Sequence, residues 1–236
     1  MRKLGLVALL MVALASPAMA GQIQVGYPGS SYGPYQTDRG GEFTLNVLSG
    51  WLSTSSYVMS TSGFGAATTF QTFCLEIGEF LYPYGPTYNA VVNPNAVYGG
   101  VGPGGDPISK GTGWLYSQFA LGTLAYYNYG DTSNGYFSDR HAAAAALQNT
   151  IWWLEGEAGD PGGTNRFRNL VLGLPFNPFA DGGVDYGVYA LNLTDNSGRR
   201  YQDQLFYRGV PDGGMTLMLL GGALIGLGAL HRKFRA

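Results

Sequence analysis

The sequence predicts an α+β fold, with an antiparallel sheet or partial barrel that carries a two-helix insertion. Three observations support this prediction. Residues 42–48, 68–77 and 184–207 contain runs in which polar and apolar side chains alternate, as they do in half-buried strands. Residues 110–127 and 139–155 instead repeat apolar side chains at helical spacing. Because the two helices are grouped together between strands, an antiparallel sheet is favoured over a parallel one.

The first half of the chain supplies most of the expected strands. Residues 20–40 are polar and rich in Gly, Tyr and Ser, and we expect an extended lead-in segment there. Residues 42–48, 56–59 and 68–77 combine alternation with β-branched and aromatic side chains, so each predicts a strand. Residues 82–106 hold many Pro, Gly and Asn residues and predict a long loop.

The helical segments differ in the strength of their signals. Residues 110–127 place apolar side chains three and four positions apart. Residues 139–155 give the stronger signal, because Ser138 or Asp139 can cap the start and five consecutive alanines favour the interior. Gly156 suits the position that follows the last helical residue.

The end of the expected domain returns to strands. Residues 160–183 resemble a loop in composition. Residues 184–194 and 201–207 predict a closing strand pair, and the Asp-Asn-Ser-Gly run at 195–198 predicts the tight turn between them.

The chain begins with the features of an export signal. Arg2 and Lys3 are followed by an apolar run over residues 4–14, and Ala18-Met19-Ala20 forms a small-x-small cleavage site. We therefore expect a signal peptide at residues 1–20. The domain at residues 21–209 is then exported.

The C-terminal end has a motif, an apolar run and a basic stop, in that order. The motif consists of Val210, Pro211, Asp212, Gly213 and Gly214. The apolar run at 215–230 predicts a single hydrophobic helix, somewhat shorter than the roughly 20 residues of a comfortable membrane span. The basic residues after it are expected to stay in the cytoplasm. Residues 210–236 therefore form a separate C-terminal segment.

This tail resembles the PEP-CTERM sorting signals of Gram-negative bacteria. It is most similar to their Val-Pro-Asp-Ser-Gly-type variant, with Gly213 where Ser is usual. The resemblance implies processing by an exosortase-type membrane protease, in hosts that usually make exopolysaccharide. It implies a location in the cell envelope, on the outer surface or in the extracellular matrix, with the helix in the membrane before processing. A plain tail anchor is the alternative.

Composition restricts the partners of the exported part. All 15 acidic residues of the chain lie within residues 21–214, together with only 8 of the 13 basic ones. This acidic balance argues against nucleic acid and anionic lipid as partners. The single cysteine excludes an intramolecular disulfide, and the chain holds only two histidines, one of them in the basic tail. A histidine-based zinc site is therefore not expected, nor is any cofactor.

Cys74 and Gln148 are the candidate reactive pair. Cys74 lies near the end of the strand expected at 68–77, and Gln148 lies on the helical face that also carries Ala144, Ile151 and Trp152. Since that face should point inward, the Gln148 amide needs buried partners, and leaving them unmade costs about 1–3 kcal/mol. A lone thiol and an inward amide suggest that the two react with each other. The other reading is an inert buried thiol and a hydrogen-bonded core amide.

The stretches around these residues resemble the motifs of bacterial surface thioester domains. In that family an aromatic or Leu residue precedes the Cys, as Phe73 does here. The Gln lies in an apolar-Gln-x-x-apolar-Trp motif, as Gln148 does before Trp152. The resemblance implies an internal thioester between Cys74 and Gln148, and covalent attachment when a surface amine attacks it. From residue type, we expect Phe73 and Trp152 to pack around the bond.

The leading hypothesis is thus a covalent adhesion module rather than an enzyme. The alternative is a non-covalent structural or carbohydrate-associated component of the extracellular matrix, in which tyrosines of 82–84 and 126–129 contact sugars. Weaker candidates are a Cys74–His141 catalytic pair, glycosidase-like glutamates at 76 and 79 or 155 and 157, and a calcium site at 195–203.

Overall fold

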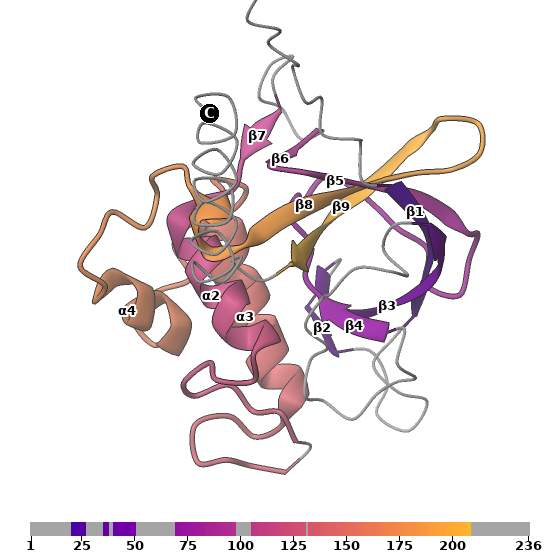
Figure 1. Cartoon of the computed structure of the whole chain (residues 1–236). Helices are drawn as coiled ribbons and strands as arrows, with labels where there is room; N and C mark the ends of the chain where they lie inside the picture. Colours follow the sequence, from indigo (N-terminus) through magenta and orange to yellow (C-terminus); the bar gives the residue numbers. More distant parts are fainter. Residues whose placement is uncertain are drawn as a thin grey trace, which may run out of the picture.

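The protein folds into a curled antiparallel sheet with helices packed on one side of it (Figure 1). The computed structural model describes residues 20–26, 35–37, 40–50, 69–97, 105–130 and 132–208. The expected α+β class with an antiparallel sheet is confirmed. Nearly all of the expected signal peptide, the strand expected at 56–59 and the segment 210–236 lie outside the described residues.

The main sheet has the strand order β2-β3-β1-β5-β8-β9, and β4 pairs with β3 away from this path. All of its pairings are antiparallel. Its strands are β1 (Ala20–Gly26), β2 (Tyr35–Thr37), β3 (Gly40–Gly50), β4 (Thr69–Thr72), β5 (Tyr88–Asn93), β8 (Val188–Thr194) and β9 (Arg200–Tyr207). A second, short pair joins β6 (Asn95–Ala96) to β7 (Asp106–Pro107).

The two ends of the curled sheet meet just after β4. The Leu75 amide donates to the Asp203 carbonyl over 3.0 Å, and the Leu205 amide donates to the Phe73 carbonyl over the same distance. Cys74 lies between them and forms an isolated antiparallel bridge with Gln204 of β9. The residues after β4 therefore continue the sheet onto β9 and close the curl.

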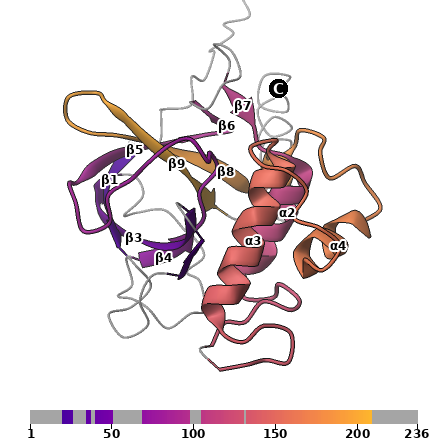
Figure 2. The same ribbon diagram turned by 180° about the vertical axis from the view of Figure 1, so that it is seen from behind.

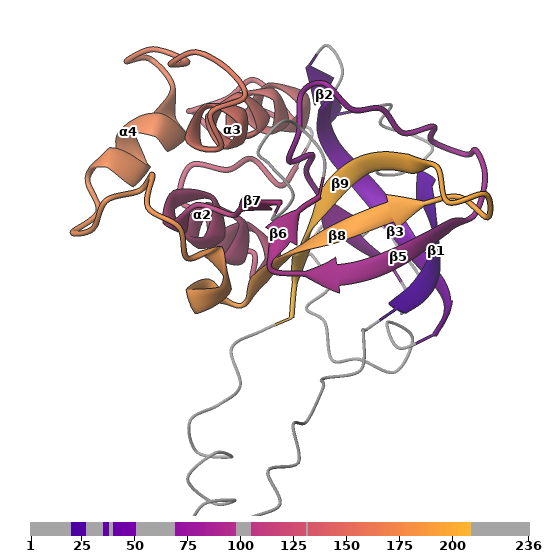
Figure 3. The same cartoon turned by 90° about the horizontal axis from the view of Figure 1, so that it is seen from above.

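The helices all lie between β7 and β8 in the sequence. They are α2 (Lys110–Ala120), α3 (Arg140–Leu154), α4 (Arg166–Leu172) and the short 3₁₀ helix η1 (Gly183–Tyr186). Figure 2 shows α2 and α3 between the strands and α4, and the view in Figure 3 agrees. The insertion thus holds three α-helices, not the expected two.

Two apolar clusters form the core. One lies inside the curl and is built almost wholly from strand residues, with Cys74 and Trp152 as further members. The other lies between the helices and the sheet, where Phe73 and Leu75 pack with residues of α2 and α3. Because successive side chains of an extended segment point to opposite faces, Cys74 faces the inner core while both of its neighbours face the helices.

Several boundaries expected from the sequence need correction. Within the lead-in segment expected at 20–40, residues 20–26 form β1, which pairs on both sides with β3 and β5. Within the loop expected at 82–106, residues 88–93 form β5, whose side chains alternate between buried and half-buried. In both places pairing with neighbouring strands outweighs the Gly- and Pro-rich surroundings.

The helical region also differs from expectation at two points. The helix expected at 110–127 ends at Ala120, because Gly122 adopts a left-handed φ of 73°. The loop expected at 160–183 contains α4, which begins after Asn165. That side chain accepts hydrogen bonds from the Phe167 and Arg168 amides and so caps the helix.

Candidate functional site

Cys74 is held at the seam that closes the sheet. Its side chain is fully buried, and its thiol is the one cysteine thiol of the chain. The nearby Thr72 hydroxyl donates to the Leu205 carbonyl over 2.6 Å, and the Tyr116 hydroxyl of α2 donates to the same carbonyl over 3.0 Å. These bonds fix the backbone on both sides of the seam, so the position of Cys74 is set by the sheet and by α2.

Gln148 reaches the same place from α3. The helix starts where the Asp139 side chain accepts a hydrogen bond from the Ala142 amide over 2.8 Å. It ends at Leu154, and the expected stop residue Gly156 follows the C-cap with a φ of 79°. Gln148 lies two turns into the helix and is fully buried, as its helical face predicts.

The structure brings Gln148 and Cys74 together. The Cys74 amide donates to Oε1 of Gln148 over 3.0 Å, and Nε2 of Gln148 donates to the Cys74 carbonyl over 2.8 Å. The side-chain amide of Gln148 is thus bound on both of its ends by the backbone of Cys74. The two residues are 74 positions apart in the sequence, and the fold places them in direct contact.

A second backbone group binds the Gln148 carbonyl. The Gly41 amide donates to Oε1 of Gln148 over 3.0 Å. Two N–H groups, from Gly41 and Cys74, therefore converge on one carbonyl oxygen. This is the arrangement that stabilises negative charge on an oxygen when a nucleophile adds to the carbonyl carbon. Gly41 has a φ of 146°, a conformation that side-chain-bearing residues rarely adopt.

Trp152 packs beside Gln148 against the start of β3. It lies one helical turn after Gln148 and is 2% exposed. A Cβ atom added to Gly40 would lie 2.3 Å from Cζ2 of Trp152 and 3.2 Å from Cδ of Gln148. The indole ring, the Gln148 carbonyl and the start of β3 therefore pack against one another, and only glycine fits at position 40.

Phe73 approaches the site from the opposite side of the sheet. Its ring is fully buried and packs edge-to-face on Phe119 of α2, with 5.0 Å between ring centroids. It lies in the core between helices and sheet, whereas Cys74 and Trp152 lie in the inner core. Trp152 therefore shares the inner core with Cys74, whereas Phe73 lies on the other face of the sheet. The expected packing of both residues around a thioester bond stays a prediction.

The sulfur of Cys74 lies in an apolar environment with one side-chain donor. Burial raises the pKa of the thiol to about 12, while hydrogen bonds from the Gln204 side chain and the Gly41 amide act in the opposite direction. Nε2 of Gln204 lies 3.5 Å from the sulfur. The resting thiol is therefore protonated, and chemistry at the sulfur depends on the few groups that can stabilise its negative charge.

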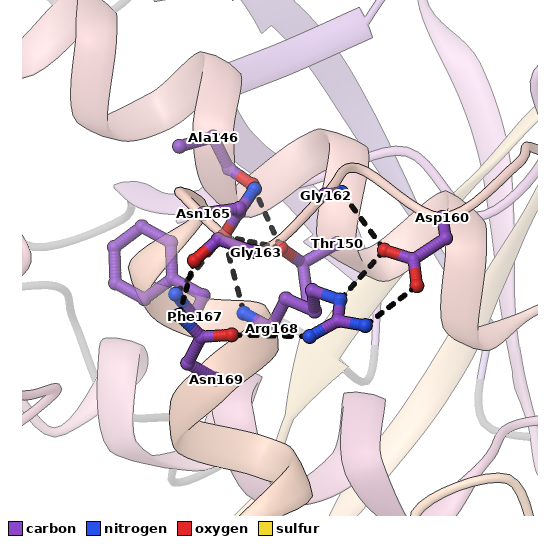
Figure 4. A network of polar contacts seen from close by, with 9 residues as sticks. All are labelled: Ala146, Thr150, Asp160, Gly162, Gly163, Asn165, Phe167, Arg168 and Asn169. Atoms are coloured by element: carbon purple, nitrogen blue, oxygen red, sulfur yellow. Dashed lines mark hydrogen bonds and ion pairs between the residues drawn. The ribbon is translucent and has the colours of Figure 1, made fainter.

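A polar network holds α4 and its preceding loop onto α3 (Figure 4). The Asn165 amide nitrogen donates to the Ala146 carbonyl over 2.9 Å, and the Thr150 hydroxyl donates to Oδ1 of Asn165 over 3.1 Å. Arg168 forms a bidentate ion pair with Asp160, at 2.6 and 2.7 Å. Since Ala146 and Thr150 flank Gln148 in sequence, this network supports the helix that carries the reactive amide.

The residues of the alternative catalytic pair and of the alternative calcium site are not arranged for those functions. His141 is exposed on the first turn of α3, whereas Cys74 is fully buried, so the two are not arranged as a catalytic pair. Asp195 caps its own turn by accepting from the Ser197 and Arg199 amides. Among the residues that the structure describes, no group of three or more acidic, His or Cys side chains could hold a metal ion.

Glu79 and Glu155 accept hydrogen bonds from neighbouring parts of the scaffold. Glu79 accepts from the Asp203 amide over 3.0 Å, and burial raises its pKa to about 7. Glu155 accepts from the Ser109 hydroxyl over 2.8 Å at the start of α2, and burial raises its pKa to about 7 as well. Burial raises the pKa of Glu76 too, and the nearby Glu157 carboxylate adds to the effect.

The tyrosines expected to contact sugars fall into two groups. Tyr127 and Tyr129 pack in the core, and the Tyr127 hydroxyl donates to the buried Glu42 over 2.6 Å. Tyr82, Tyr84 and Tyr126 are exposed, with Tyr84 at 71%. Only the exposed group is available to a ligand.

The predicted sorting motif, Val210–Gly214, lies outside the described residues, as does the apolar run after it. In the part of the chain that the structure describes, no helix has the length and apolar character needed to cross a membrane.

Sequence reasoning missed Gly40, Gly41 and Gln204. The Gly-Gly pair at the start of a strand could have indicated a close backbone approach. Gln204 shares a strand face with Phe206, and an apolar neighbour two positions away indicates that the face points inward.

Comparisons of the chain with protein families, with curated proteins and with solved structures gave no match.

Proposed function

We propose that the exported domain forms an internal thioester between Cys74 and Gln148 and acts as a covalent adhesion module. The observation that carries this proposal is the pair of N–H groups, from Gly41 and Cys74, on the Gln148 carbonyl oxygen. They polarise the carbonyl, and they lie where the tetrahedral intermediate would carry its negative charge. Burial of both side chains excludes the bulk water that would compete with the intended nucleophile.

The proposed chemistry has two steps. The Cys74 sulfur adds to the carbonyl carbon of Gln148, and the side-chain nitrogen leaves as ammonia with the thiol proton. An amine on a target surface then adds to the same carbon, and the sulfur leaves and takes up a proton. The target is joined to Gln148 by an amide bond, and Cys74 is again a thiol. Cysteine suits this exchange because its thiolate is a good leaving group.

Intact mass is the direct test. The purified chain should be lighter than its sequence by one ammonia, and incubation with methylamine should add one methylamine to that lighter form. Cys74→Ala and Gln148→Ala should both show the full sequence mass and take up no methylamine. Gln202→Ala, which removes a different buried amide, should keep the mass deficit. A full-mass parent chain whose Cys74 is freely alkylated after unfolding would refute the proposal.

The predicted termini complete the proposal. A signal peptide at residues 1–20 exports the domain, and the tail from Val210 directs it to an exosortase-type protease and to the cell envelope or extracellular matrix. Replacement of the motif Val210–Gly214 by alanines should leave the unprocessed chain in the membrane fraction of an exosortase-bearing host. Identical processing of the two forms would contradict this assignment.

A second candidate function rests on the exposed aromatic residues. Tyr126 and Tyr136 pack edge-to-face with centroids 4.8 Å apart, and the Arg166 guanidinium lies within 6 Å of both rings. Exposed rings of this kind can stack on sugars. If Tyr126→Ala and Tyr136→Ala weaken sedimentation with exopolysaccharide while Cys74→Ala does not, the domain is a non-covalent matrix component.

A further inference from the structure

The side-chain amide of Gln204 is the side-chain donor beside the reactive sulfur. Its Nε2 atom lies 3.5 Å from Sγ of Cys74, within the range for a hydrogen bond to sulfur. Gln204 is fully buried, like Cys74 itself. The thiol therefore meets an amide N–H from β9, on the other strand of the seam.

The sheet fixes this contact. Cys74 and Gln204 are partners in the bridge that closes the curl, so their side chains leave the backbone at the same level of the seam. Gln204 also shares its strand face with Phe206, which belongs to the inner core together with Cys74. The backbone pairing therefore keeps these two side chains next to each other.

The other hydrogen-bonding capacity of the Gln204 side chain is poorly used. Oε1 of Gln204 has no hydrogen-bond partner among the described residues, although it is buried. Among the described residues, its nitrogen makes two other hydrogen bonds, both long, to the Gln202 and Asp203 carbonyls at 3.4 and 3.3 Å. A buried unpaired carbonyl costs stability. Packing alone would therefore favour an apolar side chain of the same size at this position.

We propose that Gln204 is a catalytic residue of the thioester chemistry, whose Nε2–H group donates to the Cys74 sulfur while that sulfur carries negative charge. This inference rests on the proposed function. It adds a third element to the site: Gly41 and Cys74 amides stabilise charge on the carbonyl oxygen, and Gln204 stabilises it on sulfur.

The charge on sulfur appears in both directions of the reaction. When an amine R–NH₂ attacks Cδ of Gln148, a C–N bond forms and the C–S bond breaks. The electron pair of the C–S bond goes to Sγ, which afterwards takes the proton released by the amine nitrogen. In thioester formation the same thiolate is the attacking group. The inner core is apolar, and the nearby Glu79 carboxylate disfavours the thiolate.

Gln204→Met tests the proposal, because methionine keeps the size of the side chain and removes the donor. A hydrogen bond to a charged partner is worth about one to two powers of ten in rate, so methylamine coupling should become about 10- to 100-fold slower. The free energy of unfolding should stay equal or rise, since the unpaired Oε1 is removed as well. If Gln204 has only a structural role, the coupling rate should stay unchanged and the free energy of unfolding should fall.

Gln202→Met is the matched control. Gln202 lies two positions away on the same strand face, is fully buried and also has an unpaired Oε1 atom. Its nitrogen donates to the Glu76 carbonyl over 2.8 Å and not to the sulfur. The coupling rate of this variant should match that of the parent chain. Equal rates in Gln202→Met and Gln204→Met would overturn the proposal.

A second measurement does not depend on thioester formation. In Gln148→Met chains Cys74 stays a thiol, and its reaction with methyl methanethiosulfonate at one alkaline pH reports the thiolate fraction. Adding Gln204→Met should slow this reaction about tenfold or more, and adding Gln202→Met should not. If both additions act alike, Gln204 has no effect on the sulfur. If only Gln204→Met acts but the parent chain forms no thioester, the proposed function fails and the contact with sulfur stands.

Discussion

Gly40→Ala is the substitution whose effect follows most directly from the packing at the site. The added Cβ atom would lie 2.3 Å from Cζ2 and 2.6 Å from Cη2 of Trp152. Both distances are far below van der Waals contact, and the indole is fixed because it is buried among strands of the curl. Either β3 or the ring must move, and either movement displaces the Gln148 carbonyl, which would lie 3.2 Å from the new atom.

Overpacking of this kind costs about 1–3 kcal/mol. For a domain of this size the melting temperature should fall by about 2–12 °C. Gly78→Ala is the control, because a Cβ atom there meets nothing within 4 Å. Thermal unfolding followed by circular dichroism on the two variants and the parent chain gives the comparison, and the same samples give the yield of the ammonia-deficient mass.

Trp152→Phe should relieve the clash, since it removes the ring atoms that Gly40 faces. The indole Nε1 has no hydrogen-bond partner among the described residues, so no bond is lost with it. The double variant should therefore be more stable than the sum of the two single effects, by about 0.5–3 kcal/mol. Strict additivity, or a Gly40→Ala chain as stable as Gly78→Ala, would show that the ring does not pack on Gly40 as described.

Three further predictions concern the scaffold. Asn165→Ala removes the cap of α4 and two hydrogen bonds to α3. The free energy of unfolding, measured by urea titration, should therefore fall by about 1–2 kcal/mol or more. Asn177→Ala, at an exposed position, is the control. Arg140 pairs with Glu42 in the core, so Arg140→Met should cost about 3–5 kcal/mol by the same assay, because it leaves a buried carboxylate without its cation. A loss below about 1 kcal/mol would contradict this account of the pair. Burial raises the pKa of Glu155 from 4.5 to about 7, so the folded chain binds this proton more tightly than the unfolded chain does. Its contribution to stability is complete below about pH 4.5 and is lost as the pH rises through 7, and Glu155→Gln should flatten the fall of the melting temperature over this range.

Local signals were sufficient for the parts of the fold that carry their own caps and turns. Asp139 and Gly156 bound α3 as the sequence predicts, and the turn at 195–198 joins β8 to β9. The inward direction of Gln148 followed from helical spacing alone. These features depend on residues close together in the chain, which a sequence pattern can show.

Features that depend on distant partners could not be predicted. β5 reads as a loop because prolines lie on both sides of it, and it becomes a strand only between β1 and β8. The seam that joins Cys74 to Gln204 spans 130 positions, and no local pattern indicates it. The sequence predicted two residues of the site, while the backbone donor from Gly41 came from tertiary structure.

The clamp between Gln148 and the backbone of Cys74 also bears on the unfolded chain. A covalent bond at this point would close a ring of about 74 residues. In the chain-entropy model of cross-links, the lower conformational entropy of the unfolded chain then stabilises the folded state by about 4 kcal/mol. Reaction with a target opens that ring. Capture of a surface amine would then make the domain easier to unfold at the moment it becomes attached, so a bound module would differ from a waiting one in its susceptibility to force and to proteases.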